Sequence, residues 1–373
     1  MKSKRQPKVH KYSKHRRKNT NPAQTALSVA LTFLIAGAIG VVGYSVAKPL
    51  LQYDGKVQPD LSVAETAQPA VTTAVPVATQ TETVPATEAP TEAAACESGV
   101  RLSAEALQSA DALQQALAKA RSDSPNGKLL VIPLKVQGGA VLYQTNVETA
   151  KQCGAAQGNL TLPQITAAAM EQGWTPVAEC SLLYDNLLPK FRVEAGYQTA
   201  DGSQWLDNSA DNGGKPWASP LSTVTLQYLT ELTQEIAASD FSQIWFADAV
   251  FPPFRDSDLA YIGSSVEAEN RRTGMQQFLQ SLLPAAKGKP ISLEISAAKA
   301  KDGTAEAFAP EQFTAISGYV LRLDSGDDTA EVISQWAASA LQGKALWLME
   351  DDTAKISGEN NWILSESPLA NET

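Results

Sequence analysis

Hydrophobic and polar positions divide the chain into an N-terminal part with one long apolar run and a C-terminal part with many short ones. From residue 97 onward, short apolar runs alternate with longer stretches in which apolar positions recur every three or four residues. The first pattern is typical of buried strands and the second of amphipathic helices. Strands that alternate with helices predict a parallel sheet covered by helices.

The predicted strands cover residues 128–134, 175–181, 243–250, 290–296, 318–323, 345–349 and 361–364, after a short apolar segment at 99–102. The predicted helices cover 104–120, 162–172, 221–238, 265–283 and 328–341, with a helical turn at 309–314 and a long polar loop at 184–218. Seven or eight strand–helix units favour a closed (β/α)8 barrel of the TIM type over an open doubly wound sheet. No glycine-rich loop follows the first strand, so nothing indicates dinucleotide binding.

A separate apolar segment precedes this region. Residues 26–47 hold no charge over 22 positions, and a helix of that length spans roughly 33 Å, which matches bilayer hydrocarbon. Residues 1–25 hold nine Lys or Arg and no acid, which places the N-terminus in the cytoplasm. We therefore expect a single-pass plasma-membrane protein whose main domain is extracellular. A signal peptide cleaved near Ala47 is the alternative, which the length of the apolar run disfavours.

The remaining boundaries follow from composition. Residues 1–25 form a basic cytoplasmic tail and residues 26–47 the transmembrane helix. Residues 48–96 are rich in Pro, Thr and Ala without periodicity, which predicts a disordered stalk. Residues 97–373 form the extracellular barrel.

Charge and histidine content exclude several functions. With nine of the 30 basic residues in the tail, 21 remain against 40 acidic residues, so the rest of the chain carries a net charge of −19 and is a poor partner for nucleic acid. Both histidines, His10 and His15, lie in the tail. The barrel therefore has no Ser-His-Asp or Cys-His catalysis and no histidine-ligated zinc, and we predict neither a metal site nor a cofactor. The three cysteines leave one thiol over, or all three free.

Acidic residues stand at the C-terminal ends of several predicted strands. These are Glu179, Asp248, Glu294 and Glu350. In a barrel such ends meet on one face, and glycoside hydrolysis uses two carboxyl groups, one as acid and one as nucleophile or base. Acidic residues are also common after strands simply because loops are solvated.

Strand alternation separates these candidates. Ser292, Glu294 and Ser296 share one face of their strand, opposite three aliphatic residues, as a polar inner face requires. We predict Glu294 as one catalytic carboxyl and Asp248 or Glu350 as the other. Lys135 and Glu179 end two further strands and are candidates for substrate binding.

Aromatic residues in the 184–218 loop add a second kind of candidate. Trp205 and Trp217, with Tyr184 and Tyr197, either stack against sugar rings or pin the loop to the barrel.

Three segments of this region together resemble a bacterial family of putative glycoside hydrolases with a TIM-barrel domain (DUF4015), over roughly residues 99–349. Residues 129–135 (LLVIPLK) resemble the family's V-I-D-x-K-D-D-x-G strand, and residues 213–220 (GGKPWASP) resemble G-x-x-W-x-D-P. Residues 241–252 (FSQIWFADAVFP) resemble F-D-E-I-Q-F-D-Y-V-R-F-P, and residues 292–295 (SLEI) the later S-A-D-V strand. The resemblance implies a barrel that acts on carbohydrate.

Several family carboxylates are absent from the matching positions. Pro133, Ser219 and Ala247 stand where the family has Asp, and Asp248 is displaced by one residue, which turns a strand side chain to the opposite face unless a bulge intervenes. Among the polar positions, Lys135 and Glu294 are kept.

Two functions therefore stay open. One is a membrane-anchored glycoside hydrolase that acts on cell-wall or extracellular polysaccharide through paired carboxylates. The other is a catalytically inactive barrel that binds glycan or serves as an envelope scaffold. Both predict polysaccharide and the membrane, through residues 26–47, as partners.

Overall fold

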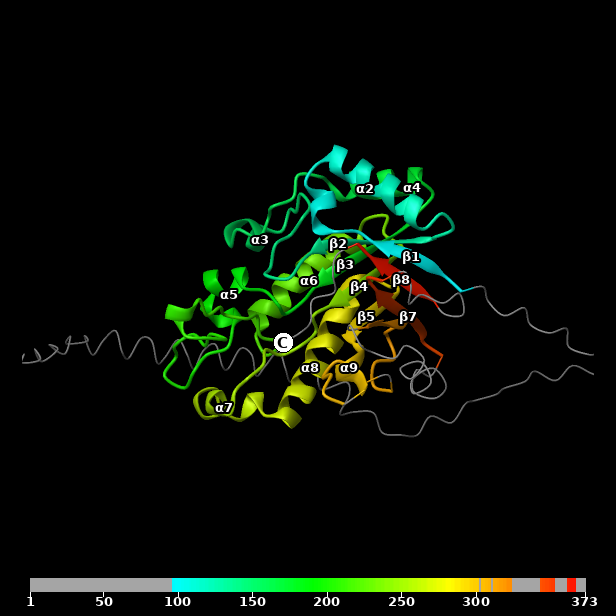
Figure 1. Ribbon diagram of the computed structural model, residues 1–373. Helices are drawn as coiled ribbons and strands as arrows, with labels where there is room; N and C mark the ends of the chain where they lie inside the picture. The colour runs from blue at the N-terminus through cyan, green and yellow to red at the C-terminus, as the bar shows by residue number, and fades with distance from the viewer. Residues whose placement is uncertain (1–95, 302, 310, 324–342, 353–360, 367–373) are drawn as a thin grey trace, which may run out of the picture. The chain divides into compact units, whose positions relative to one another are not determined.

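Among the described residues, eight parallel strands pair in sequence order and close into a barrel when β8 meets β1 (Figure 1). The strands are β1 (Ser98–Arg101), β2 (Leu129–Lys135), β3 (Thr175–Ser181), β4 (Gln243–Ala247), β5 (Ile291–Ser296), β6 (Gly318–Arg322), β7 (Ala345–Glu350) and β8 (Trp362–Ser365). This arrangement confirms the expected (β/α)8 type of barrel.

The helices lie outside this barrel. They are α2 (Ala110–Asp123), α3 (Glu148–Gln152), α4 (Leu162–Glu171), α5 (Leu187–Phe191), α6 (Thr223–Ala237), α7 (Asp256–Ile262), α8 (Ala268–Leu282) and α9 (Ala297–Lys301). Short 3-10 helices are η1 (Ala104–Leu107), η2 (Val193–Ala195), η3 (Ala210–Asn212), η4 (Ser264–Val266) and η5 (Leu283–Ala286). Helices α2 and α4 lie side by side, as do α6 and α8 (Figure 1).

The computed structural model describes residues 96–301, 303–309, 311–323, 343–352 and 361–366, all within one compact unit, Glu88–Thr373. In these ranges no helix is long and apolar enough to cross a membrane. The expected tail, transmembrane segment and stalk, and the helix expected at 328–341, lie outside the described residues.

Polar side chains cap the start of two of the helices. Ser109 accepts a hydrogen bond from the backbone N–H of Ala112 and starts α2, so the helix expected from residue 104 is divided into η1 and α2. Thr161 and Gln164 form a reciprocal capping box at the start of α4. At the helical turn expected at 309–314, the N–H groups of Gln312 and Phe313 donate to the Ala309 carbonyl, so a single turn forms there. The regular helix of this part of the chain, α9, directly follows β5.

Two apolar layers hold the barrel together. The larger lies between the strands and the helices, and Ile291, Leu293 and Ile295 of β5 belong to it. The smaller fills the interior and consists of Leu129, Val131, Val177, Trp245, Val320, Trp347, Met349 and Ile363. The alternation of β5 therefore directs Glu294 inward, as the sequence pattern predicted.

At Gly318 the interior packing closely approaches the backbone. A Cβ atom at this position would lie 2.5 Å from the Trp347 ring and 2.8 Å from the carbonyl oxygen of Ala345. The Gly318→Ala substitution should lower the free energy of unfolding by about 1–3 kcal/mol, the usual cost of overpacking. Urea denaturation tests this, with the exposed neighbour Ser317→Ala as the control. An unchanged midpoint for Gly318→Ala would show that the interior has spare room.

Candidate functional site

A cleft of about 460 Å³ opens at the C-terminal ends of the strands. The segments that follow β2, β3, β4 and β5 contribute Gln137, Tyr184, Asp248 and Lys299 to its walls. Functional sites of (β/α)8 barrels lie at this end, where loops from several strands converge. The cleft is therefore the candidate site.

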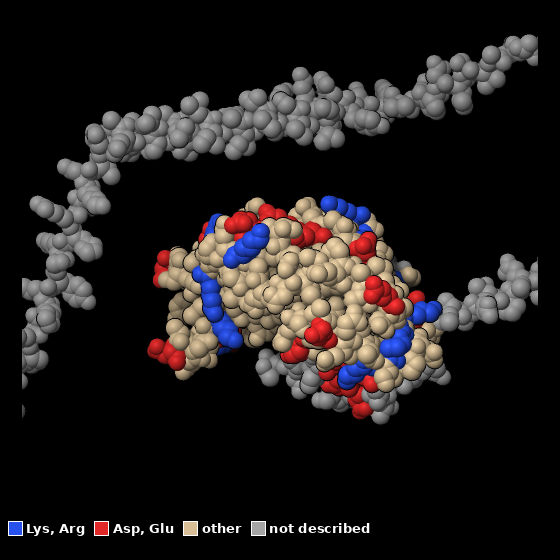
Figure 2. Space-filling model, turned by 90° about the horizontal axis from the view of Figure 1, so that it is seen from above, with Lys and Arg blue, Asp and Glu red and all other residues tan. Residues whose placement is uncertain are grey.

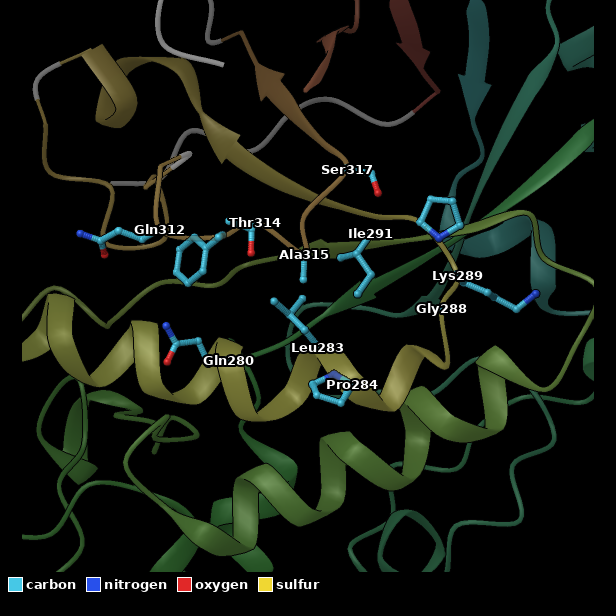
Figure 3. Close-up of a pocket in the computed structure, with 12 residues that line it drawn as sticks. Gln280, Leu283, Pro284, Gly288, Lys289, Ile291, Gln312, Thr314, Ala315 and Ser317 are labelled. Carbon is cyan, nitrogen blue, oxygen red and sulfur yellow. The ribbon is translucent and has the colours of Figure 1, made fainter. Parts of the chain in front are cut away.

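A second cavity, of about 470 Å³, lies at the opposite end of the strands. It is lined by the residues that precede β5 and β6 and by the end of α8, and Figure 3 shows Leu283 and Ala315 facing each other across it. Residues at this end of a (β/α)8 barrel usually serve stability. We assign it no part in the chemistry at the other end.

Asp248 brings a carboxylate to the cleft through an unusual backbone conformation. It directly follows β4, and its φ of +53° lies in the left-handed region, which is costly for a residue with a side chain. Strand alternation would turn Asp248 outward, yet its carboxylate accepts hydrogen bonds from Ser181 Oγ at 2.5 Å and Gln137 Nε2 at 2.9 Å. The left-handed turn thus compensates for the one-residue displacement seen in the sequence.

An aromatic pair forms the neighbouring wall. Tyr184 and Trp217 stack with ring centroids 4.1 Å apart and an angle of 10° between planes. Trp217 Nε1 donates a hydrogen bond to Asp207 Oδ2 at 3.0 Å, and the backbone N–H of Gly138 donates to the Tyr184 carbonyl at 2.8 Å. The connections after β2 and β3 thereby fix the pair, and both contribute residues to the cleft.

Lys135, which we expected to bind substrate, is instead buried in an ion pair away from the cleft. Pro133 has no N–H for the ladder, and the register between β2 and β3 shifts after it, so that Lys135 lies opposite Cys180. Cys180 packs in the layer between barrel and helices. Lys135 Nζ lies 3.0 Å from Asp185 Oδ2 and donates to the Ser181 carbonyl at 2.8 Å.

Two ion pairs occupy the C-terminal part of the barrel interior. Arg101 donates to both carboxylate oxygens of Glu179, at 2.5 and 2.6 Å. Arg322 Nη1 lies 3.3 Å from Glu294 Oε1. All four side chains are largely or fully buried. Neither Glu179, expected to bind substrate, nor Glu294, expected to be catalytic, lines the cleft.

Burial and the negative charge of Glu179 together raise the pKa of Glu294 to about 7, against the opposing effect of Arg322 and Arg101. A carboxyl group with such a pKa holds a proton in mildly acidic solution, as a general acid does. The same environment arises whenever several charges share a dry interior, so the shift alone does not identify a catalyst.

Two further candidates lie elsewhere. Glu350 ends β7 and is buried, but the alternation of the strand places it on the side of Leu346 and Leu348, which pack outward. Trp205 packs against Tyr197 and Phe254, so it pins the loop and does not line the cleft.

The wall opposite the aromatic pair is charged. Arg271 of α8 and Glu306, from the segment after α9, form an ion pair at 3.4 Å. The guanidinium of Arg271 lies 5.9 Å from the centre of the Phe251 ring, and Lys299 lines the same side. Burial raises the pKa of Glu306 above its ordinary value.

Sequence reasoning missed the cations. Arg101 and Arg322 end β1 and β6 on the inward face, so a search of strand ends for basic as well as acidic residues would have found them. Arg271 comes from a helix and gave no such signal.

The described residues hold no cluster of three or more His, Cys, Asp and Glu that fits a metal ion. All three cysteines are free: Cys96 is exposed, Cys153 is half-buried and Cys180 is buried.

The closed parallel barrel and the family model together make this a glycoside-hydrolase-like domain. The chain belongs to the family described as "Putative glycosyl hydrolase domain", which matches residues 99–312. The match spans β1 to β5 and ends before β6. No curated protein matches the chain.

Several solved structures are similar. A hypothetical protein from Ruminiclostridium thermocellum has 18% identity and a TM-score of 0.42, over 52% of this chain and 96% of that one. The chitobiase of Flavobacterium johnsoniae has 13% identity and a TM-score of 0.47, over 69% and 38%. The glycoside hydrolase domain of PelA from Pseudomonas aeruginosa has 13% identity and a TM-score of 0.36, over 63% and 79%. The chain thus spans less than two thirds of the chitobiase.

The Lys135–Asp185 pair makes a prediction about stability. Lys135→Met leaves the Asp185 carboxylate buried without its cation and should cost about 3–5 kcal/mol of unfolding free energy. Adding Asp185→Asn removes that charge but keeps the oxygen that accepts the N–H groups of Leu187 and Leu188. The double variant should therefore recover most of the loss in urea denaturation. If the double variant is as unstable as Lys135→Met, the uncompensated charge of Asp185 is not the cause of the lost stability.

Glu294 makes a prediction about pH. Its pKa of about 7 lies above the value of an unfolded chain, so the folded state binds more protons between about pH 4.5 and 7 and its stability falls as pH rises through that window. The difference in unfolding free energy between Glu294→Gln and wild type should therefore grow from pH 5 to pH 7.5. A pH-independent difference would contradict the raised pKa.

Proposed function

We propose that this domain binds carbohydrate in the cleft at the C-terminal end of the barrel and does not hydrolyse it. The proposal rests on where the carboxylates of the barrel lie and on which groups hold them. Glu179 and Glu294 are held by arginines inside the barrel. Each of the three carboxylates that line the cleft is also engaged: Asp248 by Ser181, Asp207 by Trp217 and Glu306 by Arg271. Hydrolysis of a glycosidic bond requires two carboxyl groups on either side of it in the cleft.

The cleft keeps the features that sugar binding needs. Tyr184, stacked on the largely buried Trp217, offers an apolar surface for a sugar ring, and Asp248 and Gln137 offer polar atoms beside it. Sites of this kind combine an apolar lining with a few fixed polar groups that orient the ligand.

Hydrolysis is the second candidate. The pKa of Glu294, raised to about 7, suits a general acid, and Asp248 would serve as the second carboxylate. This function requires that Glu294 reach the substrate.

Location completes the proposal. The uncharged 26–47 segment behind nine cations supports a single-pass anchor with the barrel outside the cell. The Pro-rich stalk would give the barrel reach toward cell-wall or extracellular polysaccharide. On the face shown in Figure 2, acidic groups are spread among Lys and Arg, with no continuous basic patch of the kind that binds nucleic acid.

One experiment separates binding from hydrolysis. The full-length chain in mild detergent is incubated with neutral and acidic cell-wall polysaccharides, and both retention of polysaccharide and release of reducing ends are measured. We expect retention without release. Tyr184→Ala should weaken retention roughly tenfold, since a stacked aromatic contributes on the order of 1 kcal/mol or more. The matched control is Tyr261→Ala, which changes an exposed tyrosine outside the cleft.

Release of reducing ends that disappears in Glu294→Gln and in Asp248→Asn would establish the hydrolase instead. Equal retention by wild type and Tyr184→Ala would remove the cleft from the proposal.

The anchor is tested on membranes from cells that express the full chain. We expect the protein to stay in the pellet after alkaline carbonate extraction, and to become soluble when residues 26–47 are deleted. Recovery of a soluble chain that begins after Ala47 would instead indicate a cleaved signal peptide.

A further inference from the structure

We infer that Arg271 makes the cleft selective for saccharides that carry an isolated anionic group, such as one carboxylate or one phosphate. This inference rests on the proposed function and adds to it the class of ligand.

Neighbouring side chains hold Arg271 in one orientation at the cleft. Its guanidinium is fixed between the Phe251 ring, 5.9 Å away, and Glu306, 3.4 Å away, and it lines the cleft. The Nε atom is buried and is the atom that lies 3.4 Å from Glu306 Oε1, without hydrogen-bond geometry. A planar guanidinium held in this way still has donors to offer, and its fork matches the two oxygens of a carboxylate or phosphate.

The two carboxylates on the other wall, Asp207 and Asp248, already accept hydrogen bonds from the protein. Asp207 already accepts hydrogen bonds from Trp217 Nε1 at 3.0 Å and from the backbone N–H of Lys215 at 2.7 Å. Asp248 accepts two as well, from Ser181 and Gln137. Their hydrogen bonds hold that wall in place, and the guanidinium in the lining of the cleft is that of Arg271.

The charge of the wall that holds Arg271 differs from the net charge of the rest of the chain. Arg271 and Lys299 are the cations among the residues that line the cleft, whereas the chain beyond its basic tail carries a net charge of −19. An acidic domain repels a dense polyanion over long range. A single anionic group on an otherwise neutral saccharide avoids most of that repulsion and still reaches the guanidinium.

The test uses the full-length chain in mild detergent and isothermal titration calorimetry with four probes. These are a neutral hexasaccharide, the same hexasaccharide with one uronic acid, the same with one phosphate, and polygalacturonate. The variants are Arg271→Gln, Arg271→Lys and the double variant Arg271→Gln/Glu306→Gln, which leaves no buried carboxylate unpaired. Arg272→Gln is the matched control, because it removes the same charge from the exposed neighbour outside the cleft.

We expect a single-anion probe to bind roughly tenfold or more tightly than the neutral one. The ratio should fall to about one in Arg271→Gln and in the double variant, recover in part in Arg271→Lys, and persist in Arg272→Gln. The preferred single-anion probe then identifies the anion.

Equal affinity for neutral and single-anion probes, or a preference that survives in the double variant, would overturn the inference and leave the proposed function intact. Tightest binding to polygalacturonate, weakened equally by Arg271→Gln and Arg272→Gln, would assign the effect to general surface charge and would also overturn it. Absence of binding to every probe would overturn the proposed function and this inference together.

Discussion

Charges inside the barrel must be paired, and the arrangement of the C-terminal end follows from that constraint. Arg101 and Glu179 share two hydrogen bonds, and Arg322 lies beside Glu294. A charge left alone in such an interior would cost several kcal/mol, so each carboxylate depends on its arginine. The pairing stabilises the interior above the apolar layer formed by Trp245 and its neighbours, and it keeps both carboxylates out of the cleft.

The cleft is built by different means. A left-handed turn carries the Asp248 carboxylate to Ser181, and the stacked Tyr184 and Trp217 lie beside it. Backbone strain of this kind persists where surrounding contacts enforce it, and it often marks a functional position. The family's fold and a cleft at the C-terminal end of the strands are thus present, while Glu179 and Glu294 are paired with arginines inside the barrel.

Much of the fold was predictable because parallel strands buried on both sides give continuous apolar runs, and β2, β3 and β5 are within one residue of their expected bounds. The inward direction of Glu294 followed from alternation. Lys135 was misplaced because the register shift after Pro133 depends on pairing with β3. The short helix α5 was missed because Asp185, which receives the N–H groups of Leu187 and Leu188, is itself positioned by a distant lysine.

The most direct test of this account is a crystal structure of the barrel with an oligosaccharide bound. The account predicts sugar rings stacked on the Tyr184–Trp217 wall, with the hydrogen bonds between Arg101 and Glu179 unchanged. A ligand whose glycosidic oxygen lies within hydrogen-bond distance of Glu294, with Arg322 displaced from that carboxylate, would contradict it and restore the chemistry of a hydrolase.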